Sequence, residues 1–98
     1  MASLFATVFP DANQTALGDI EAVLTVATLS GTNQQTAVVA DGGTTKIKRV
    51  RVFVDGNAWV SYGTNPDATD TAKRFPMGSE NPEYFTVPVG AKFAAITR

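Results

Sequence analysis

Basic and aromatic residues gather in the middle of the chain, where together they could bind nucleic acid. Residues 46–51 read Lys-Ile-Lys-Arg-Val-Arg and form the only basic run, and Phe53, Trp59 and Tyr62 follow closely. Positive side chains beside rings that stack on bases are typical of single-strand binders. Alternating charges also keep the solvent face of an ordinary strand soluble and block edge pairing. The formal net charge of −1 favours this second interpretation, because long-range attraction of nucleic acid needs a strongly positive field.

Two pairs of carboxylates, Asp67 with Asp70 and Glu80 with Glu83, have a spacing that could supply an acid and a base. Two carboxyl groups about 5–9 Å apart are what glycoside hydrolysis requires. Both pairs lie in polar, Pro-containing segments that are typical of solvated loops, without an apolar pocket to keep one acid protonated. The oxygens of Asp67, Thr69 and Asp70 could instead hold a surface Ca²⁺. Turns are the preferred interpretation of both segments.

The chain has no Cys and no His, which excludes many kinds of chemistry. Thiol catalysis, Fe–S clusters, Ser-His-Asp triads and nearly all zinc sites need one of these side chains. We therefore expect a protein that is not an enzyme, with no catalytic residue, no cofactor and no metal. Polar residues interrupt the longest nearly uncharged stretch, 22–40, and no basic segment opens the chain, so we expect neither a signal peptide nor a membrane span.

The elements that must position these residues are predicted to be strands. The chain is rich in Val, Thr and aromatic residues and poor in Glu and Lys, and turn signals recur at short intervals. We predict one all-β domain over residues 1–98, a small, mostly antiparallel β-sandwich that is jelly-roll-like or immunoglobulin-like. Residues 14–21 could be a short helix or a loop. The predicted strands are 4–9, 22–30, 35–39, 47–54, 58–63, 84–87 and 92–97.

Residues 55–57, Asp-Gly-Asn, are predicted to close a hairpin between the strands 47–54 and 58–63. A two-residue loop would mix apolar and charged side chains on both faces, whereas a three-residue loop separates them. In the second register Val54 faces Ala58, Val52 faces Val60 and Val50 faces Tyr62. The opposite face then combines basic and aromatic side chains, as either a cation–π cluster under loops or an exposed contact patch. Its residues are Arg49, Arg51, Phe53, Trp59 and Ser61.

Six segments, in order over almost the whole chain, resemble a known family. They are residues 1–5 (Met-Ala-Ser-Leu-Phe), 49–53 (Arg-Val-Arg-Val-Phe), 58–69 (Ala-Trp-Val-Ser-Tyr-Gly-Thr-Asn-Pro-Asp-Ala-Thr), 75–78 (Phe-Pro-Met-Gly), 83–87 (Glu-Tyr-Phe-Thr-Val) and 90–96 (Gly-Ala-Lys-Phe-Ala-Ala-Ile). The set resembles the small all-β structural proteins of tailed bacteriophages. Their members carry a V-R-V or V-R-L strand, a strand ending in F-G-x-N-P-T-A-T, an E-Y-F-x-V and a closing G-D-K-I-A-x-I. The chain departs from this pattern at Tyr62, Asp67 and Ala91, where the family has Phe, Thr and commonly Asp.

The resemblance implies a non-enzymatic virion component, most simply a capsid decoration or cement protein. Such a protein would stabilise the icosahedral head by binding between subunits of the major capsid protein, and would itself be a dimer or trimer. It would be assembled in the host cytoplasm and reside on the capsid surface. The implied contacts are Ser3, Leu4 and Phe5, which could add an edge strand to a neighbour, and the face of Arg49, Arg51, Phe53 and Trp59.

Two alternatives stay open at this point. A protein of the same fold could sit at the head–tail junction, in the tail or in a fibre. A protein of another class, a small β-barrel that binds single-stranded nucleic acid, would use the basic strand. We expect no membrane partner and do not favour a nucleic-acid partner.

Overall fold

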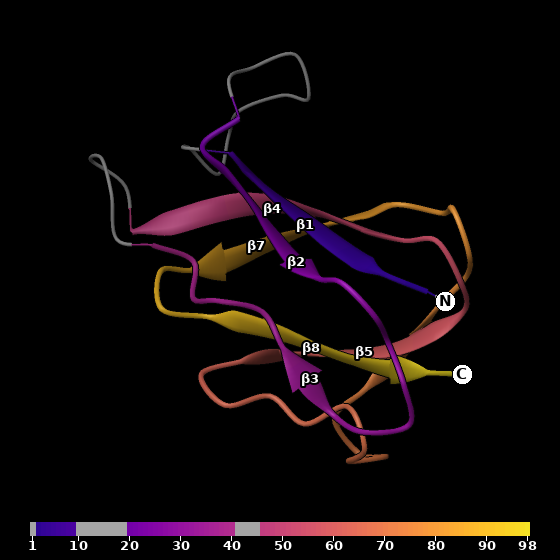
Figure 1. The fold of residues 1–98 in the computed structure, drawn as a ribbon. Helices are drawn as coiled ribbons and strands as arrows, with labels where there is room; N and C mark the ends of the chain where they lie inside the picture. Colours follow the sequence, from indigo (N-terminus) through magenta and orange to yellow (C-terminus); the bar gives the residue numbers. More distant parts are fainter. Residues whose placement is uncertain (1, 10–19, 41–45) are drawn as a thin grey trace.

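The computed structural model describes residues 2–9, 20–40 and 46–98, and these residues form eight strands (Figure 1). The predicted bounds of β1, β4, β5 and β8 are confirmed. β2 and β3 are shorter than predicted, β7 is one residue longer at each end, and β6 was not predicted. β6 has only three residues, and its central residue is Pro76, which cannot donate a ladder hydrogen bond and so argues against a strand. Most of the predicted helix or loop at 14–21 lies outside the described residues. The strands are β1 (Leu4–Phe9), β2 (Ala22–Val26), β3 (Gln34–Gln35), β4 (Ile47–Val54), β5 (Ala58–Gly63), β6 (Phe75–Met77), β7 (Glu83–Pro88) and β8 (Lys92–Thr97).

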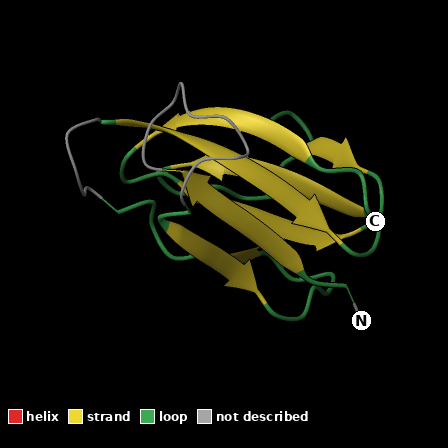
Figure 2. Cartoon of the chain, turned by 90° about the horizontal axis from the view of Figure 1, so that it is seen from above, coloured by secondary structure: helices red, strands yellow, loops and turns green. Residues whose placement is uncertain are grey.

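Two four-stranded antiparallel sheets form the domain, which confirms the predicted β-sandwich. Sheet A has the order β2-β1-β4-β7 and sheet B the order β3-β8-β5-β6. Figure 1 shows sheet A lying above sheet B, and Figure 2 shows the same layers from above. The chain changes sheet at every connection except β1–β2 and β5–β6. This repeated crossing between two four-stranded sheets matches the jelly-roll alternative better than the immunoglobulin one, whose last two strands share a sheet.

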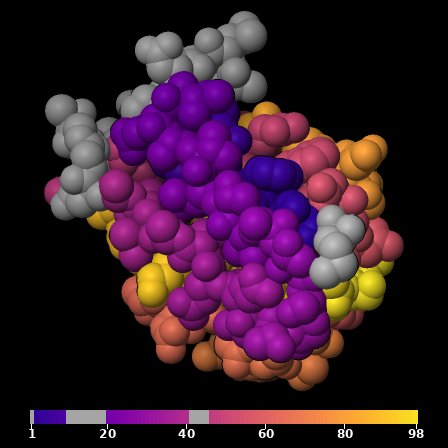
Figure 3. Space-filling model, viewed as in Figure 1, coloured from indigo at the N-terminus to yellow at the C-terminus, as the bar shows by residue number. Residues whose placement is uncertain are grey.

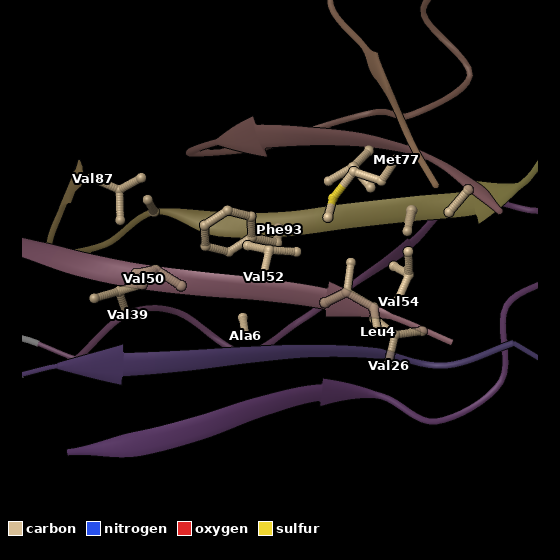
Figure 4. Packing of buried hydrophobic residues seen from close by; sticks show 14 of the residues in the cluster. Leu4, Ala6, Val26, Val39, Val50, Val52, Val54, Met77, Val87 and Phe93 are labelled. Atoms are coloured by element: carbon tan, nitrogen blue, oxygen red, sulfur yellow. The ribbon is translucent and has the colours of Figure 1, made fainter. Parts of the chain in front are cut away.

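The core lies between the sheets and consists of the inward-facing alternate residues of their strands (Figure 4). β4 contributes Val50, Val52 and Val54, and β5 contributes Ala58 and Val60, all of them fully buried. Burial of each Val-sized side chain stabilises the fold by about 1.5–3 kcal/mol. β4 and β5, inner strands of different sheets, thus both contribute to one core.

Four aromatic rings contribute a further part of the packing between the sheets. Tyr62 of β5, Phe75 of β6, Phe85 of β7 and Phe93 of β8 form a chain of ring contacts with centroid distances of 5.2–6.2 Å. Tilted and edge-on pairs at such distances add about 0.5–1.5 kcal/mol each to the effect of burial. Through these ring contacts the edge strands β6 and β7 pack against the inner strands β5 and β8.

The predicted hairpin at residues 55–57 is wrong. β4 pairs with β1 and β7, whereas β5 pairs with β6 and β8, so the two strands belong to different sheets. The residues 55–57 carry the chain from sheet A to sheet B. A hairpin and a crossover bury the same alternate residues of both strands, so the apolar pattern could not separate them.

The Asp-Gly-Asn sequence suits this crossover because its side chains hold neighbouring segments. The Asp55 carboxylate accepts a hydrogen bond from the Ser3 amide, and the Asn57 Oδ1 accepts one from the Ser79 amide at 2.8 Å. A Cβ on Gly56 would lie 2.7 Å from the Ala2 Cβ, so the close approach of the N-terminal segment requires glycine. The crossover is therefore a junction of three segments.

The turn between β7 and β8 has a glycine at its position of positive φ. Gly90 has a φ of 88°, and the Ala91 amide donates to the Pro88 carbonyl at 3.3 Å. A positive φ at the third residue of a four-residue turn is the condition that favours glycine there. This turn also changes sheets, because β7 lies in sheet A and β8 in sheet B.

Candidate functional site

The predicted face of Arg49, Arg51, Phe53 and Trp59 is divided by the crossover. The three β4 residues alternate with its buried valines and point outward from sheet A. Trp59 alternates with the buried residues of β5 and points outward from sheet B. Since the sheets stack with their inner faces together, the two groups lie on opposite sides of the domain. The single predicted patch is thus two surfaces.

The outer face of sheet A joins the three β4 residues to two aromatic side chains from its neighbours. Phe5 of β1 is the register partner of Phe53, and Tyr84 of β7 is the partner of Arg51. The rings of Phe5 and Phe53 lie 6.4 Å apart, and the Arg51 guanidinium lies 5.6 Å from the centre of the Phe53 ring. The Arg49 guanidinium lies 4.5 Å from the centre of the Tyr84 ring. We call Phe5, Arg49, Arg51, Phe53 and Tyr84 the sheet A face.

The sheet A face is exposed, partly apolar and positively charged. Phe5 and Tyr84 are 36% and 41% exposed, whereas the other three side chains are half-buried. Among the described residues, no carboxylate forms an ion pair with either arginine. The buried Arg49 Nε has no hydrogen-bond partner among the residues that the structure describes. Buried donors are nearly always satisfied, so this unpaired donor sets Arg49 apart from the other described side chains.

The basic run that includes these arginines does not form one surface. Lys48 points inward from β4, is fully buried, and places its Nζ 3.1 Å from the Glu21 Oε2. Arg49 and Arg51 point outward. Alternation along the strand therefore removes Lys48 from any platform for nucleic acid, and the two arginines on the outer face already lie against aromatic rings.

Trp59 lies on the outer face of sheet B, where residues 64–74 cover it. Its ring packs against Ala68 of this loop and against Ala94 and Ile96 of β8. The Arg74 guanidinium lies 4.0 Å from the centre of the ring and donates from Nη1 to the Ala68 carbonyl at 3.4 Å. A small cluster beneath a long loop is a normal part of a folded domain. In this position Trp59 stabilises the loop instead of forming an open contact patch.

Polar side chains from the segment before and within β3 hold the same loop. Asn33 donates from Nδ2 to the Pro66 carbonyl at 3.2 Å and accepts from the Ala68 amide through Oδ1 at 2.8 Å. Gln35 donates from Nε2 to the Pro66 carbonyl and to the Asn65 Oδ1, both at 2.9 Å. Four hydrogen bonds from two side chains thus connect this segment to the loop.

The carboxylates Asp67 and Asp70 shape the loop itself. Asp67 accepts hydrogen bonds from the Thr69 hydroxyl at 2.6 Å and the Thr69 amide at 2.9 Å, which lower the pKa of Asp67 below its ordinary value of 3.8. Asp70 accepts from the Ala72 amide at 3.0 Å. Both carboxylates border an open cleft of about 290 Å³ beside the end of β5. In the described ranges, no three His, Cys, Asp or Glu side chains gather as a metal site.

The predicted N-terminal contact is wrong in its geometry. Leu4 is fully buried in the core, and Ser3 is engaged by Asp55 and by the Ala27 carbonyl. β1 pairs with β2 on one edge and with β4 on the other, so it has no free edge with which to pair a neighbour. Of the three residues, Phe5 alone is exposed, and it belongs to the sheet A face.

Sequence reasoning missed Tyr84 as a member of this face. Tyr84 stands 33 positions after Arg51, and only the antiparallel pairing of β4 with β7 brings them together. The alternation of exposed and buried residues along 83–88 shows that Tyr84 points away from the core, but it does not identify the neighbouring strand. Cross-strand neighbours follow from the register, which local sequence leaves open.

Comparison of the chain with known protein families, with curated proteins and with solved structures finds no match. The resemblance to phage structural proteins therefore stays a prediction. A separate search of the described residues finds no helix with the length and hydrophobicity needed to span a membrane. The sheet A face is consequently the main basis on which a function can be argued.

Proposed function

We propose that the chain is a non-enzymatic structural protein of a tailed-phage virion, and that it decorates the capsid by binding between subunits of the major capsid protein. The observation that carries this proposal is the sheet A face, a partly apolar surface with two arginines and three rings. Aromatic and arginine side chains are the residues enriched at protein interfaces and at their energetic centres. The sequence segments that resemble phage structural proteins are the reason for proposing a capsid protein as the partner.

The charge of the face indicates what the partner must offer. Arg49 and Arg51 have no ion pair among the described residues. A capsid surface that carries carboxylates would pair these guanidinium groups, and an apolar rim would cover Phe5 and Tyr84. The same positive face opposes direct stacking on a second copy of itself, because it would bring four guanidinium groups together.

Cementing would act through mass action. A ligand that binds the assembled shell and not its separated subunits stabilises the shell by its binding free energy at each site. Many symmetric sites repeat this effect over the capsid surface. The rigid β-sandwich supports this role because an already ordered face loses little conformational freedom on binding.

The test is binding of the purified protein to expanded capsid shells of the phage that encodes it, together with the thermal stability of those shells. We expect wild-type protein to bind and to raise the dissociation temperature of the shell. Arg51→Glu is expected to weaken binding by at least about 30-fold, because it replaces attraction by repulsion at the centre of the face. Lys73→Glu makes the same change of charge on the loop over sheet B and should bind as the wild type does. Failure of the wild type to bind or protect the shells would refute the proposal.

Copy number in the virion separates the structural alternatives. Cementing predicts hundreds of copies, whereas a ring at the head–tail junction predicts about six to twelve. Quantitative mass spectrometry of purified virions measures this ratio against the major capsid protein. A fibre or tail location would appear as copies that stay with tails after heads are removed.

The nucleic-acid alternative has its own readout. Arg49→Ala with Arg51→Ala should leave affinity for single-stranded DNA at low salt unchanged under our proposal. A large loss of that affinity, combined with wild-type affinity for capsid shells, would favour the binding of single strands by this face.

A further inference from the structure

The edges of the two sheets are not protected equally. In the part of the chain that the structure describes, the edge strands are β2 and β7 in sheet A and β3 and β6 in sheet B. β3 is only two residues long, β6 has Pro76 at its centre, and β7 begins with Glu83 and ends with Pro88. Short strands, charges and prolines are the usual devices that prevent an edge from pairing with another chain.

β2 has none of these devices. Its sequence Ala-Val-Leu-Thr-Val contains no charge, no proline and no glycine, and the next three residues, Ala27, Thr28 and Leu29, are also uncharged. Val23 is 52% exposed, and the one ladder of β2 among the described strands is with β1. Residues 20–40 form the side of the molecule that faces the viewer in Figure 3. An uncharged edge of this composition is suited to strand pairing.

We propose that β2 pairs with β2 of a second copy of the chain, antiparallel and across a two-fold axis. In the register of greatest overlap, Leu24 lies opposite Leu24 of the second copy, Ala22 opposite Val26, and Val23 opposite Thr25. Inward residues then oppose inward residues, so the outer face of sheet A continues from one copy to the next. The pair joins two four-stranded sheets into one eight-stranded sheet.

A second copy fits this edge because an uncharged strand is complementary to itself. Antiparallel pairing of two such strands opposes no like charges, and the β-branched residues pack against each other across the pair. A two-fold contact is closed, so it uses up the free edge and ends in a dimer, not a fibre. The inference does not rest on the proposed capsid function, since it involves the edge of the sheet and not the sheet A face.

Self-association in solution tests this inference, with light scattering over a concentration series as the readout. We expect wild-type protein to reach twice the chain mass of 10.3 kDa. Val23→Lys places a charge on the pairing edge at an exposed position, and should raise the Kd of the dimer at least about ten-fold without unfolding the chain. Thr86→Lys makes a matched change on the β7 edge and should leave the dimer intact. A wild type that stays at the mass of one chain, or a Val23→Lys protein that dimerises as the wild type does, overturns the proposal.

A disulfide test locates the contact directly. The chain has no cysteine, so a single introduced thiol reports one position. Opposed Cα atoms in an antiparallel pair lie about 4.5–5.5 Å apart, within the range that a disulfide bridges. Leu24→Cys should form a covalent dimer rapidly on mild oxidation, and Thr86→Cys should not. Equal cross-linking of both variants, or none at position 24, would place the contact elsewhere and overturn the proposed pairing.

Discussion

The outer faces of the two sheets use similar residues for different purposes. On sheet B, Trp59 and Arg74 stack beneath residues 64–74, and Asn33 and Gln35 hold this loop through four hydrogen bonds. On sheet A, the pairs of arginine with Phe53 or Tyr84 have no loop above them among the described residues. One face contributes to the folding of the chain itself, and the other leaves the same chemistry available to a partner.

The difference teaches that a pair of arginine and aromatic residues is not by itself a binding site. The polar groups around the pair decide its role. Around Trp59, each side-chain group of Asn33 is used by a backbone group of the loop. Around Arg49, the described residues offer the Nε no acceptor. Equivalent substitutions on the two faces should therefore affect stability on sheet B and binding on sheet A.

Truncating the aromatic residue on each face should give the largest contrast. Trp59→Ala removes the packing on Ala94, Ile96 and Ala68 and the contact with Arg74, and should lower the free energy of unfolding by roughly 2–3 kcal/mol. Phe53→Ala on the open face should lower it by about 1 kcal/mol. Urea denaturation of both variants measures the two free energies of unfolding. An equal decrease in the two variants would contradict the distinction between the faces.

Removing the polar support of the loop should have the next largest effect. Asn33→Ala leaves the amide of the buried Ala68 without its acceptor and should cost about 1–2 kcal/mol of unfolding free energy. Hydrogen exchange should show faster exchange over residues 64–74. Thr32→Ala is the control, because the exposed Thr32 uses its backbone amide in its hydrogen bond and should change stability by less than about 0.5 kcal/mol.

The titration of Asp67 tests the internal hydrogen bonds of the same loop. The Thr69 hydroxyl and amide favour the carboxylate, so the pKa of Asp67 in the folded chain lies below 3.8. Its contribution to stability is complete above pH 3.8 and is lost as the pH falls through this lower pKa. Thr69→Ala removes the larger cause and should move the pKa of Asp67 upward towards 3.8 in a carboxyl NMR titration. An unchanged midpoint would show that the hydroxyl does not hold the carboxylate.

Replacing an arginine by alanine on each face should have the smallest effect on stability. It should also show most clearly that the sheet A arginine is not needed for folding. Arg51→Ala removes an interaction at 5.6 Å on the open face and should change the free energy of unfolding by about 0.5 kcal/mol or less. Arg74→Ala removes a contact at 4.0 Å and a hydrogen bond, and should cost about 1 kcal/mol. Thermal denaturation of the pair checks this, and a larger loss for Arg51→Ala would indicate that the sheet A face is primarily structural.

Local sequence predicted the strands well where polar and apolar residues alternate clearly. The alternation in 47–54 and 58–63 identified both strands and the side of each strand that faces the core. β6 was not predicted because it is short and has a proline at its centre. The extended conformation of such a strand depends on its pairing with a neighbour, here β5. The candidate site was predicted in part, since Arg49, Arg51 and Phe53 do lie together on one face, whereas Phe5 was predicted to belong to a separate N-terminal contact.

The sequence by itself determined which side chains point into the core, because the side chains of any strand alternate with a period of two. That period is the same whether Val54 and Ala58 pair in a hairpin or face each other across two sheets. The tertiary structure decided between these arrangements, and with it the separation of Trp59 from Arg51 and the meeting of Arg51 with Tyr84. Contacts between strands that are distant in sequence depend on how the whole sheet is assembled. The alternation of polar and apolar residues within one strand does not identify the neighbouring strands.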